Sequence, residues 1–287
     1  MARIAIIGGG SMGEALLAGL LRAGRQVKDL AVAERMPERA RYLADTYSVR
    51  MTTVGEAVET ASFVIIAVKP ADAESVVGEV AEAAARAESN SVEQVLVSVV
   101  AGVTVGFYES RLPAGSPVVR VMPNAPALVG AGISALAAGR FATPEQLADV
   151  SALFECVGGV LTVPESQLDA VTAVSGSGPA YFFLFVEALV DAAVANGLNR
   201  AVATDLVVQT MAGSAAMLLD RIDGERTAGA DIGLDTTPAR LRAVVTSPGG
   251  TTAAGLRELE RGGVRAAVTA AIDAAKTRSE QLGITSE

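Results

Sequence analysis

The stretch "IAIIGGGSMGEALLAGLL", residues 4–21, joins a short run of apolar residues to a helical pattern through a cluster of glycines. Gly8, Gly10 and Gly13 have the spacing G-x-G-x-x-G, which becomes informative only between a strand and a helix. There the first glycine permits a tight turn, the second a close approach of the backbone to a pyrophosphate, and the third close packing of helix on strand. Phosphates would lie at the helix N-terminus, where N–H groups are free. The stretch therefore predicts a dinucleotide-binding turn.

Two other motifs share these residues. Gly8 and Gly13 match the first part of a P-loop, but Glu14 stands where that loop requires its lysine. Residues 9–13 match the G-x-S-x-G elbow of serine hydrolases, with Ser11 as the nucleophile. Because the chain contains no histidine, Ser11 would lack its ordinary base. A serine hydrolase would be labelled at Ser11 by a fluorophosphonate, and we expect no labelling.

The composition limits the classes of partner. The 287 residues are 51% hydrophobic, which is enough for a large buried core. The 23 basic and 32 acidic residues give a net charge of −9, and no basic run is present, so the field repels nucleic acid and anionic membranes. The lack of histidine removes the commonest zinc ligand. We therefore expect no nucleic-acid partner, no membrane partner and no bound metal.

Three features bear on the compartment. Cys156 is the single cysteine, which fits a reducing compartment and a small buried side chain. The first apolar run, residues 4–7, is too short for the core of a signal peptide. Residues 121–139 carry no charge and approach membrane-spanning length, but Pro123 and Pro126 favour a strand, a loop and a second strand. We expect a cytoplasmic protein.

Strand-like and helical runs alternate along the first half of the chain, which predicts an α/β domain with a parallel, doubly wound sheet. The expected strands lie in "RIAIIG", "DLAVAE", "SVRMT", "SFVIIAV", "QVLVSVV", "PVVRVM", "GISALA" and "GVLTV", and helices are expected over residues 14–22 and 73–86 and from Pro37 and Pro144. After Pro164, strand-like runs end and alanine- and leucine-rich segments follow over 180–196, 201–221, 239–245 and 252–281. We predict a Rossmann-like domain over residues 1–163 and an all-helical domain over residues 164–287, with a surface loop over 223–237.

The end of the second strand gives a mixed signal about the dinucleotide. Glu34 can accept from a ribose 2′-hydroxyl, as in NAD-binding domains. Arg35, with Arg39 one turn along, can hold a 2′-phosphate, as in NADP-binding domains. Lys69, followed by Pro70, comes after a buried strand, where cofactor loops lie in such domains. We favour NADPH, with NADH possible.

A second glycine turn, "TSPGGTTAAGL" over residues 246–256, precedes a helix near the end of the chain. Its glycines expose the backbone N–H groups of the first helical turn, and Ser247 can add a hydroxyl donor. Such a turn suits a small anion, or it is a helix start that binds nothing.

Several motifs together resemble the pyrroline-5-carboxylate reductases, which catalyse the last step of proline biosynthesis. They are "IIGGGSMG" (6–13), "AVKP" (67–70), "VVAGVT" (99–104), "RVMPNAPALVGAG" (120–132), "AVSGSGPAYFF" (173–183) and "VTSPGGTTAAGLRELERGGVRAAV" (245–268). They occur in order and cover nearly the whole chain. The resemblance implies an oxidoreductase that passes hydride from NAD(P)H to the C=N carbon of 1-pyrroline-5-carboxylate, giving L-proline. It also implies that the helical domain binds substrate and forms a homodimer or a ring of dimers.

The resemblance also implies roles for particular residues. The cofactor would lie on Gly8, Gly10, Ser11, Met12, Gly13, Arg35, Ala67, Val68, Lys69, Pro70 and Ala101. The substrate would lie on Glu165, Ser247, Gly250, Thr251 and Thr252. An imine can arrive protonated, so no strong acid is required, and we expect the Thr252 hydroxyl to hydrogen-bond the ring nitrogen and position it.

The chain departs from the family pattern in two places. Val54 stands where relatives often carry an asparagine that contacts the cofactor, and Thr237-Pro238 stands where many have His-Pro. Since fold does not fix substrate, three alternatives remain: another imine or β-hydroxyacid reductase, a dinucleotide-binding regulator without turnover, and a serine hydrolase.

Overall fold

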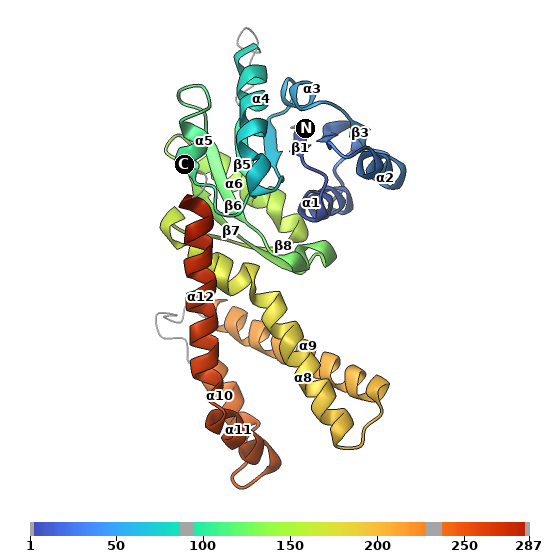
Figure 1. Ribbon diagram of the computed structural model, residues 1–287, viewed down its shortest axis with the longest axis vertical. Coiled ribbons are helices and arrows are strands. Elements are labelled where there is room, and N and C mark those ends of the chain that lie inside the picture. Colours follow the sequence, from blue (N-terminus) through green and yellow to red (C-terminus); the bar gives the residue numbers. More distant parts are fainter. Residues whose placement is uncertain (1–2, 87–93, 228–236, 285–287) are drawn as a thin grey trace. The chain divides into compact units, whose positions relative to one another are not determined.

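The computed structural model describes residues 3–86, 94–227 and 237–284 (Figure 1). The chain divides into two compact units: Met1–Pro179 together with Ile272–Glu287, and Ala180–Ala271. The first unit thus contains the whole sheet and, in addition, the start of the helical region and the end of the last helix. The functional division at residues 163 and 164 stays a prediction.

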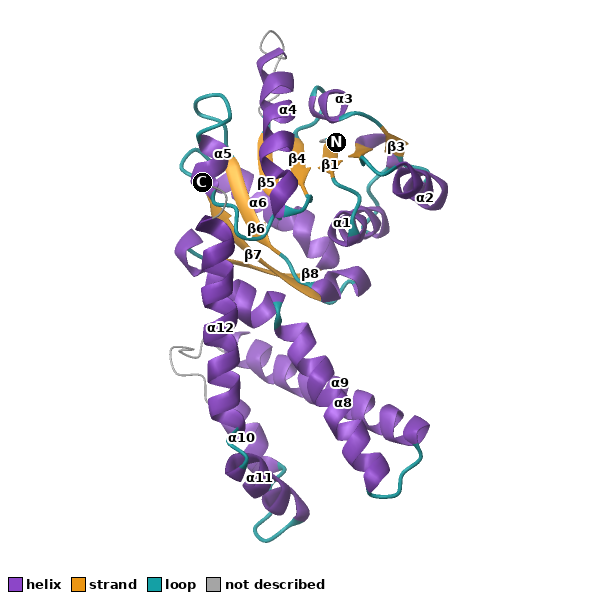
Figure 2. Cartoon of the chain, in the orientation of Figure 1, coloured by secondary structure: helices purple, strands orange, loops and turns teal. Residues whose placement is uncertain are grey.

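The described residues of the first unit form one eight-stranded sheet in the order β3-β2-β1-β4-β5-β6-β7-β8 (Figure 2). The strands are β1 (Ile4–Ile7), β2 (Leu30–Ala33), β3 (Arg50–Met51), β4 (Phe63–Ile66), β5 (Val95–Ser98), β6 (Val118–Met122), β7 (Gly132–Ala138) and β8 (Gly158–Thr162). The order of the first six is that of dinucleotide-binding folds. The Rossmann-like fold class predicted from the sequence is therefore confirmed.

One strand runs against the predicted direction. β7 pairs with β6 in antiparallel fashion, whereas the other neighbouring strands are parallel. The prediction of a fully parallel sheet was wrong here, because β6 and β7 are joined only by the short 3-10 segment η3 (Ala125–Val129). A parallel connection needs a crossover of a dozen or more residues. The strand, loop and strand expected over residues 121–139 are confirmed.

Helices cover both faces of the sheet. They are α1 (Ser11–Arg22), α2 (Pro37–Tyr47), α3 (Val54–Val58), α4 (Ala73–Arg86), α5 (Val105–Glu109), α6 (Pro144–Phe154) and α7 (Leu168–Val171), with 3-10 segments η1 (Val27–Asp29), η2 (Pro70–Asp72), η4 (Glu155–Val157) and η5 (Glu165–Gln167). Thr143 begins α6 with a capping box to Gln146, and Pro144 follows in the first turn. The helices expected from Pro37, from Pro144 and over residues 73–86 are confirmed.

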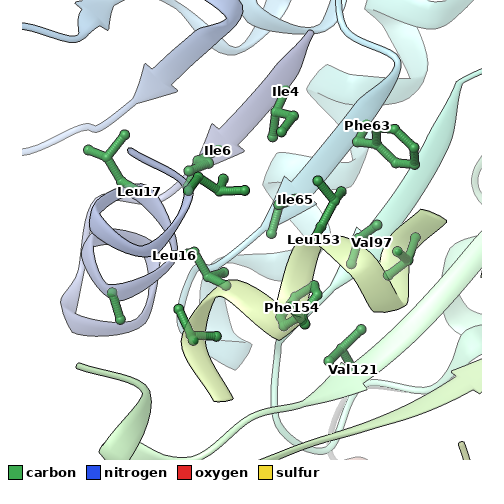
Figure 3. Packing of buried hydrophobic residues seen from close by; sticks show 14 of the residues in the cluster. Ile4, Ile6, Leu16, Leu17, Phe63, Ile65, Val97, Val121, Leu153 and Phe154 are labelled. Atoms are coloured by element: carbon green, nitrogen blue, oxygen red, sulfur yellow. The ribbon is translucent and has the colours of Figure 1, made fainter. Parts of the chain in front are cut away.

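The sheet is buried from both sides. Ile4 and Ile6 of β1 point to one core, with Leu16 of α1 and Phe154 of α6 (Figure 3). Ala5 and Ile7 point to the opposite core, which is closed by α3, α4 and α5. Successive side chains of a strand face opposite sides, so a strand covered on both faces reads as a continuous apolar run.

The helical region begins with a backbone irregularity. A π turn, η6 (Thr172–Gly176), separates α7 from α8 (Gly178–Ala195). Pro179 has no N–H to donate to the carbonyl of Ser175, and that carbonyl accepts from Asn124 Nδ2 at 3.3 Å instead. Ser177 has helical backbone angles and donates its N–H to Thr172 O at 2.9 Å, so it continues the π turn.

The remaining described elements are helices: α9 (Arg200–Thr227), α10 (Thr237–Val244), α11 (Thr251–Arg261) and α12 (Val264–Ile284). The all-helical character is confirmed, but residues 252–281 form two helices separated at Gly262 and Gly263. The loop predicted over 223–237 was wrong at its edges, because α9 continues to Thr227 and Thr237 already belongs to α10. Residues 228–236 lie outside the described residues.

The two units differ in how they bury apolar side chains. Among the described residues of the second unit, the buried hydrophobic residues are Val190 and Ala203. Large apolar side chains of α8 and α9 are exposed: Phe182, Phe183, Leu184, Phe185, Leu189, Val202, Leu206, Val208, Met211, Met217 and Leu219. Two helical stretches, Glu165–Ala195 and Arg200–Glu225, have the length and composition of membrane spans, with 11% and 6% of their apolar windows buried within this chain. Either a membrane or another protein surface can cover such faces.

Candidate functional site

The first glycine turn leaves no room for side chains beneath it. Gly8 has φ +104°, and a Cβ there would lie 2.6 Å from the carbonyl oxygen of Ala67. A Cβ at Gly13 would collide with the carbonyl oxygen of Gly8. Gly10 immediately precedes α1, and a Cβ there would meet nothing within 4 Å. The turn is closed on the protein side and open at the helix N-terminus, which fits a diphosphate.

The loops after β1 and β4 meet where the order of the sheet reverses. Ala67 donates its N–H to Ile7 O at 2.7 Å, and Val68 packs against Gly8. Lys69 and Pro70 follow at the exposed start of η2. Ala101 comes after the next strand, β5. In open α/β sheets ligands bind at this switch point, so the structure brings the predicted cofactor residues to one edge.

Ser11 and Met12 occupy different environments in α1. Ser11 is the exposed first residue of the helix, and Met12 is partly buried against the core. Neither the Ser11 hydroxyl nor any other side chain caps α1 in the described part of the chain. The first-turn N–H groups therefore keep their capacity to bind an anion.

The charged residues that follow β2 have different hydrogen-bond and ion-pair partners. Arg35 is highly exposed and pairs with Asp72 at 3.2 Å. Glu34 accepts from the N–H of Gly9 at 2.8 Å and of Met36 at 2.7 Å, through different carboxylate oxygens. Arg39 donates Nε to Gly9 O at 2.6 Å. The sequence left Glu34 and Arg39 as possible readers of the ribose 2′ group, and it gave no signal that both contact Gly9.

Glu14, in the first turn of α1, also belongs to this group. Its carboxylate pairs with Arg39 and accepts from Tyr42 at 3.1 Å and Tyr47 at 2.9 Å. Burial alone would raise the pKa of Glu14, but the hydrogen bonds from Arg39 and the two tyrosines outweigh it and hold the pKa below its ordinary value. Glu14 is thus ionised, and Arg39 balances its charge close to the expected phosphate site.

Glu165 lies in the first unit beside a buried arginine. Its Oε1 accepts from Nη1 of Arg120 at 3.1 Å and from the N–H of Val105, the first residue of α5, at 2.7 Å. The Arg120 side chain is 5% exposed and that of Glu165 is 33% exposed. A buried guanidinium requires such a partner. Through the ion pair with Arg120 and the hydrogen bond from Val105, Glu165 connects three elements: β6, η5 and α5.

The last helix of the chain reaches this region as well. Ser279 of α12 donates its hydroxyl to Asp169 Oδ1 at 2.6 Å. The backbones of Gly102 and Gly283 approach so closely that a Cβ at Gly283 would lie 2.9 Å from Gly102 O. The loop that carries Ala101 is therefore supported by the end of α12.

The second glycine turn belongs to the second unit. Gly250 donates its N–H to Ser247 O at 3.0 Å and precedes α11, and Gly249 has φ +70°. Ser247, Thr251 and Thr252 are exposed, and no side chain caps α11 among the described residues. The free first-turn N–H groups and three hydroxyls gathered here suit a small carboxylate.

Comparison with known proteins gives two family models that match this chain. The model for pyrroline-5-carboxylate reductase dimerisation matches residues 165–282, and the model described as NADP oxidoreductase coenzyme F420-dependent matches residues 3–102. The pyrroline-5-carboxylate reductase of Mycobacterium tuberculosis (strain ATCC 25618 / H37Rv) is 71% identical over 291 aligned positions, covering 100% of this chain and 99% of the relative. The chain belongs to the pyrroline-5-carboxylate reductase family.

Solved structures of pyrroline-5-carboxylate reductases share its fold. That from Coxiella burnetii has a TM-score of 0.85 and 32% identity, covering 98% of both chains. That from Plasmodium falciparum, with NADP bound, has a TM-score of 0.81 and 28% identity, again covering 98% of both chains. The exposed apolar faces of α8 and α9 fall within the dimerisation domain of the family, and they fit an oligomer.

Proposed function

We propose that this chain reduces the C=N bond of 1-pyrroline-5-carboxylate to give L-proline, with NADPH as the hydride donor. The observation that carries this function is the full-length relation, at 71% identity, to a pyrroline-5-carboxylate reductase. The chain is an NAD(P)H-dependent oxidoreductase acting on a C=N bond. When bound, the reduced nicotinamide supplies the hydride.

We propose that the first unit holds the dinucleotide. Gly8, Gly10 and Gly13 cradle the diphosphate with Ser11 and Met12, and Ala67, Val68, Lys69, Pro70 and Ala101 line the adjoining edge. Arg35 is exposed beside this edge and can pair with a 2′-phosphate, which favours NADPH over NADH. A relative with NADP bound supports this choice.

The turn before α11 receives the substrate carboxylate. The hydroxyl of Ser247 and the N–H groups after Gly250 donate to the anion, together with Thr251. Hydrogen bonds to a charged group contribute roughly 1.5–3 kcal/mol each, so two or three can orient a ligand this small. Thr252 hydrogen-bonds the ring nitrogen and orients the imine for hydride transfer.

Glu165 completes the proposed substrate residues. Its Oε1 is held by Arg120 and Val105, while Oε2 makes no hydrogen bond to any residue that the structure describes. A protonated imine is positive, and a nearby carboxylate stabilises that charge. Protonation of the ring nitrogen also makes the C=N carbon a better hydride acceptor, so no histidine is needed.

We infer that a second copy of this chain covers the exposed faces of α8 and α9, giving a homodimer or a ring of dimers in the cytoplasm. The apolar side chains lie within the part of the chain matched by the dimerisation family model. Residues 1–163 then act as the dinucleotide-binding domain and residues 164–287 as the substrate-binding and oligomerisation domain. Neither nucleic acid nor a membrane has a role in this proposal.

The test is an assay of NADPH oxidation with 1-pyrroline-5-carboxylate, with the product identified by chiral amino-acid analysis. We expect L-proline in amounts equal to the NADPH consumed. Oxidation of NADPH by a linear keto acid, or reduction of NADP+ by a β-hydroxyacid, in place of turnover of the cyclic imine would identify another reductase. NADPH binding without any turnover would identify a regulator.

A further inference from the structure

Both polar groups of the Gly9 peptide are held by side chains from a distant part of the chain. The N–H of Gly9 donates to Glu34 Oε2 at 2.8 Å, and the carbonyl of Gly9 accepts from Arg39 Nε at 2.6 Å. Gly9 lies between the first two glycines of the fingerprint. The two side chains therefore fix the orientation of the peptide in the middle of the proposed diphosphate cradle.

The environment of Gly9 leaves little freedom for another arrangement. A Cβ at Gly9 would collide with Leu43, which is fully buried, and would lie 3.2 Å from Glu34 Oε2. Glu34 also accepts from Met36 N at 2.7 Å, so each of its oxygens already has a backbone donor. The carboxylate is thus fixed against the turn from both sides.

Arg39 has a second task in the same place. Nη2 of Arg39 pairs with the carboxylate of Glu14, in the first turn of α1, while Nε donates to the Gly9 carbonyl. An uncompensated carboxylate at a helix N-terminus competes with a bound phosphate for the same positive end of the helix. Arg39 therefore shapes the turn and also removes an unfavourable charge from it.

We propose that Glu34 and Arg39 are positioning residues of cofactor binding, which act through the Gly9 peptide and do not read the ribose 2′ group. This rests on the proposed use of NADPH by this chain. A cradle held in its binding geometry before the ligand arrives loses less freedom on binding. Both dinucleotides share the diphosphate, so loss of either contact affects NADPH and NADH alike.

The experiment measures the Kd of NADPH and of NADH by isothermal titration calorimetry, together with KM and kcat for each. The variants are Glu34→Gln, Arg39→Met and Arg39→Lys, with Glu38→Gln and Arg41→Met as exposed matched controls on α2. Glu34→Gln leaves one acceptor oxygen in place of two, and Arg39→Lys keeps the positive charge. The calorimetric readings need no substrate, so they stay informative whichever imine the enzyme reduces.

We expect Glu34→Gln and Arg39→Met to raise Kd and KM for both dinucleotides by about tenfold or more, with the ratio of NADPH to NADH affinity unchanged within about twofold. kcat at saturating cofactor should change little, and Arg39→Lys should recover part of the loss. A double variant that combines Glu34→Gln with Arg39→Met should lose less dinucleotide affinity than the product of the two single effects, because both residues act on one peptide. The controls should match the parent protein.

Two results would overturn the proposal. A change of the NADPH to NADH ratio by tenfold or more in either variant would show that the altered residue reads the 2′ group. A lower kcat with unchanged Kd and KM would show only a reduced fraction of folded enzyme. Failure of the parent protein to reduce the imine, with dinucleotide binding intact, would count against the proposed substrate and leave the roles of Glu34 and Arg39 to the calorimetric result.

Discussion

The two glycine turns of this protein are built in opposite ways. In the first, Cβ atoms at Gly8 and Gly13 would meet backbone, and the Gly9 peptide is held at both of its polar groups. In the second, a Cβ at Gly249 would meet nothing within 4 Å, and Ser247 to Thr252 are largely exposed. The first turn is preorganised by its own unit, whereas the second belongs to a unit with few buried apolar residues.

The two turns therefore differ in what holds them rigid. The first unit has cores on both faces of its sheet, so its ligand turn is set by one folded chain. The second unit leaves the phenylalanines of α8 exposed. This unit lies within residues 165–282, which match the family model for pyrroline-5-carboxylate reductase dimerisation. We expect the first turn to work in a single chain and the second to depend on assembly.

The largest effect is expected at Gly13, where a substitution tests directly whether the first turn is closed. Gly13→Ala places a Cβ against Gly8 O, so we expect NADPH affinity to fall by about 100-fold or more and stability to fall by about 1–3 kcal/mol. Gly78→Ala, at an open position in α4, should leave binding unchanged and stabilise the helix by about 0.5–1 kcal/mol. Calorimetry and urea unfolding measure both. Normal NADPH binding by Gly13→Ala would show that the turn is not closed as described.

The second largest effect should come from the exposed face of α8. Phe183 is 68% exposed in the single chain, and Phe183→Arg should dissociate the oligomer and abolish most turnover, because buried aromatic anchors often contribute about 2 kcal/mol or more at an interface. NADPH binding should persist. Light scattering gives the mass, and Val129→Arg, which alters an exposed apolar residue of the first unit, is the control. Full turnover by a monomeric variant would show that the second turn, like the first, works without assembly.

Thr252 should give the next effect, confined to the second turn. Thr252→Ala should lower kcat/KM for the imine by about 10- to 100-fold through loss of one hydrogen bond to a charged group, with NADPH affinity nearly unchanged. Thr252→Ser, which keeps the hydroxyl, should recover much of the activity. Steady-state kinetics at saturating NADPH decide the matter, and unaltered kinetics in Thr252→Ala would remove the residue from the site.

The last prediction concerns chemical labelling of two thiols. One is Cys156 in the first unit, and the other is a cysteine introduced at position 247 in the second unit. Burial raises the pKa of Cys156 to about 11, outweighing the nearby arginines, and the side chain packs against α1 at Gly19. At pH 8 about one thiol in a thousand is then ionised, and alkylation should accelerate about tenfold per pH unit up to that pKa. A cysteine introduced by Ser247→Cys should react about a hundredfold faster. Equal rates at the two positions would show that the first region opens as readily as the second.

The sequence predicted most of the fold because its signals were local. Proline at the first turn marked the starts of α2 and α6, and the apolar period marked α4. The direction of β7 depends on which strand it pairs with, and the extension of α9 to Thr227 runs through residues that favour turns. Both depend on tertiary contacts, which sequence patterns do not contain.

The candidate site divides in the same way. The glycine fingerprint and the turn before α11 are local motifs, and both were visible in the sequence. The contacts of Glu34 with Gly9 and of Glu165 with Arg120 join residues 25 and 45 positions apart. No spacing rule connects such pairs, so their roles emerged only with the fold.

The most direct test of the account is the value of kcat/KM for 1-pyrroline-5-carboxylate, measured with NADPH and with NADH in parallel on the unmodified protein. We predict reduction of the imine with both dinucleotides and the higher value with NADPH, because Arg35 is exposed beside the cofactor edge while Glu34 is engaged with the turn. No oxidation of either dinucleotide in the presence of the imine would contradict the account.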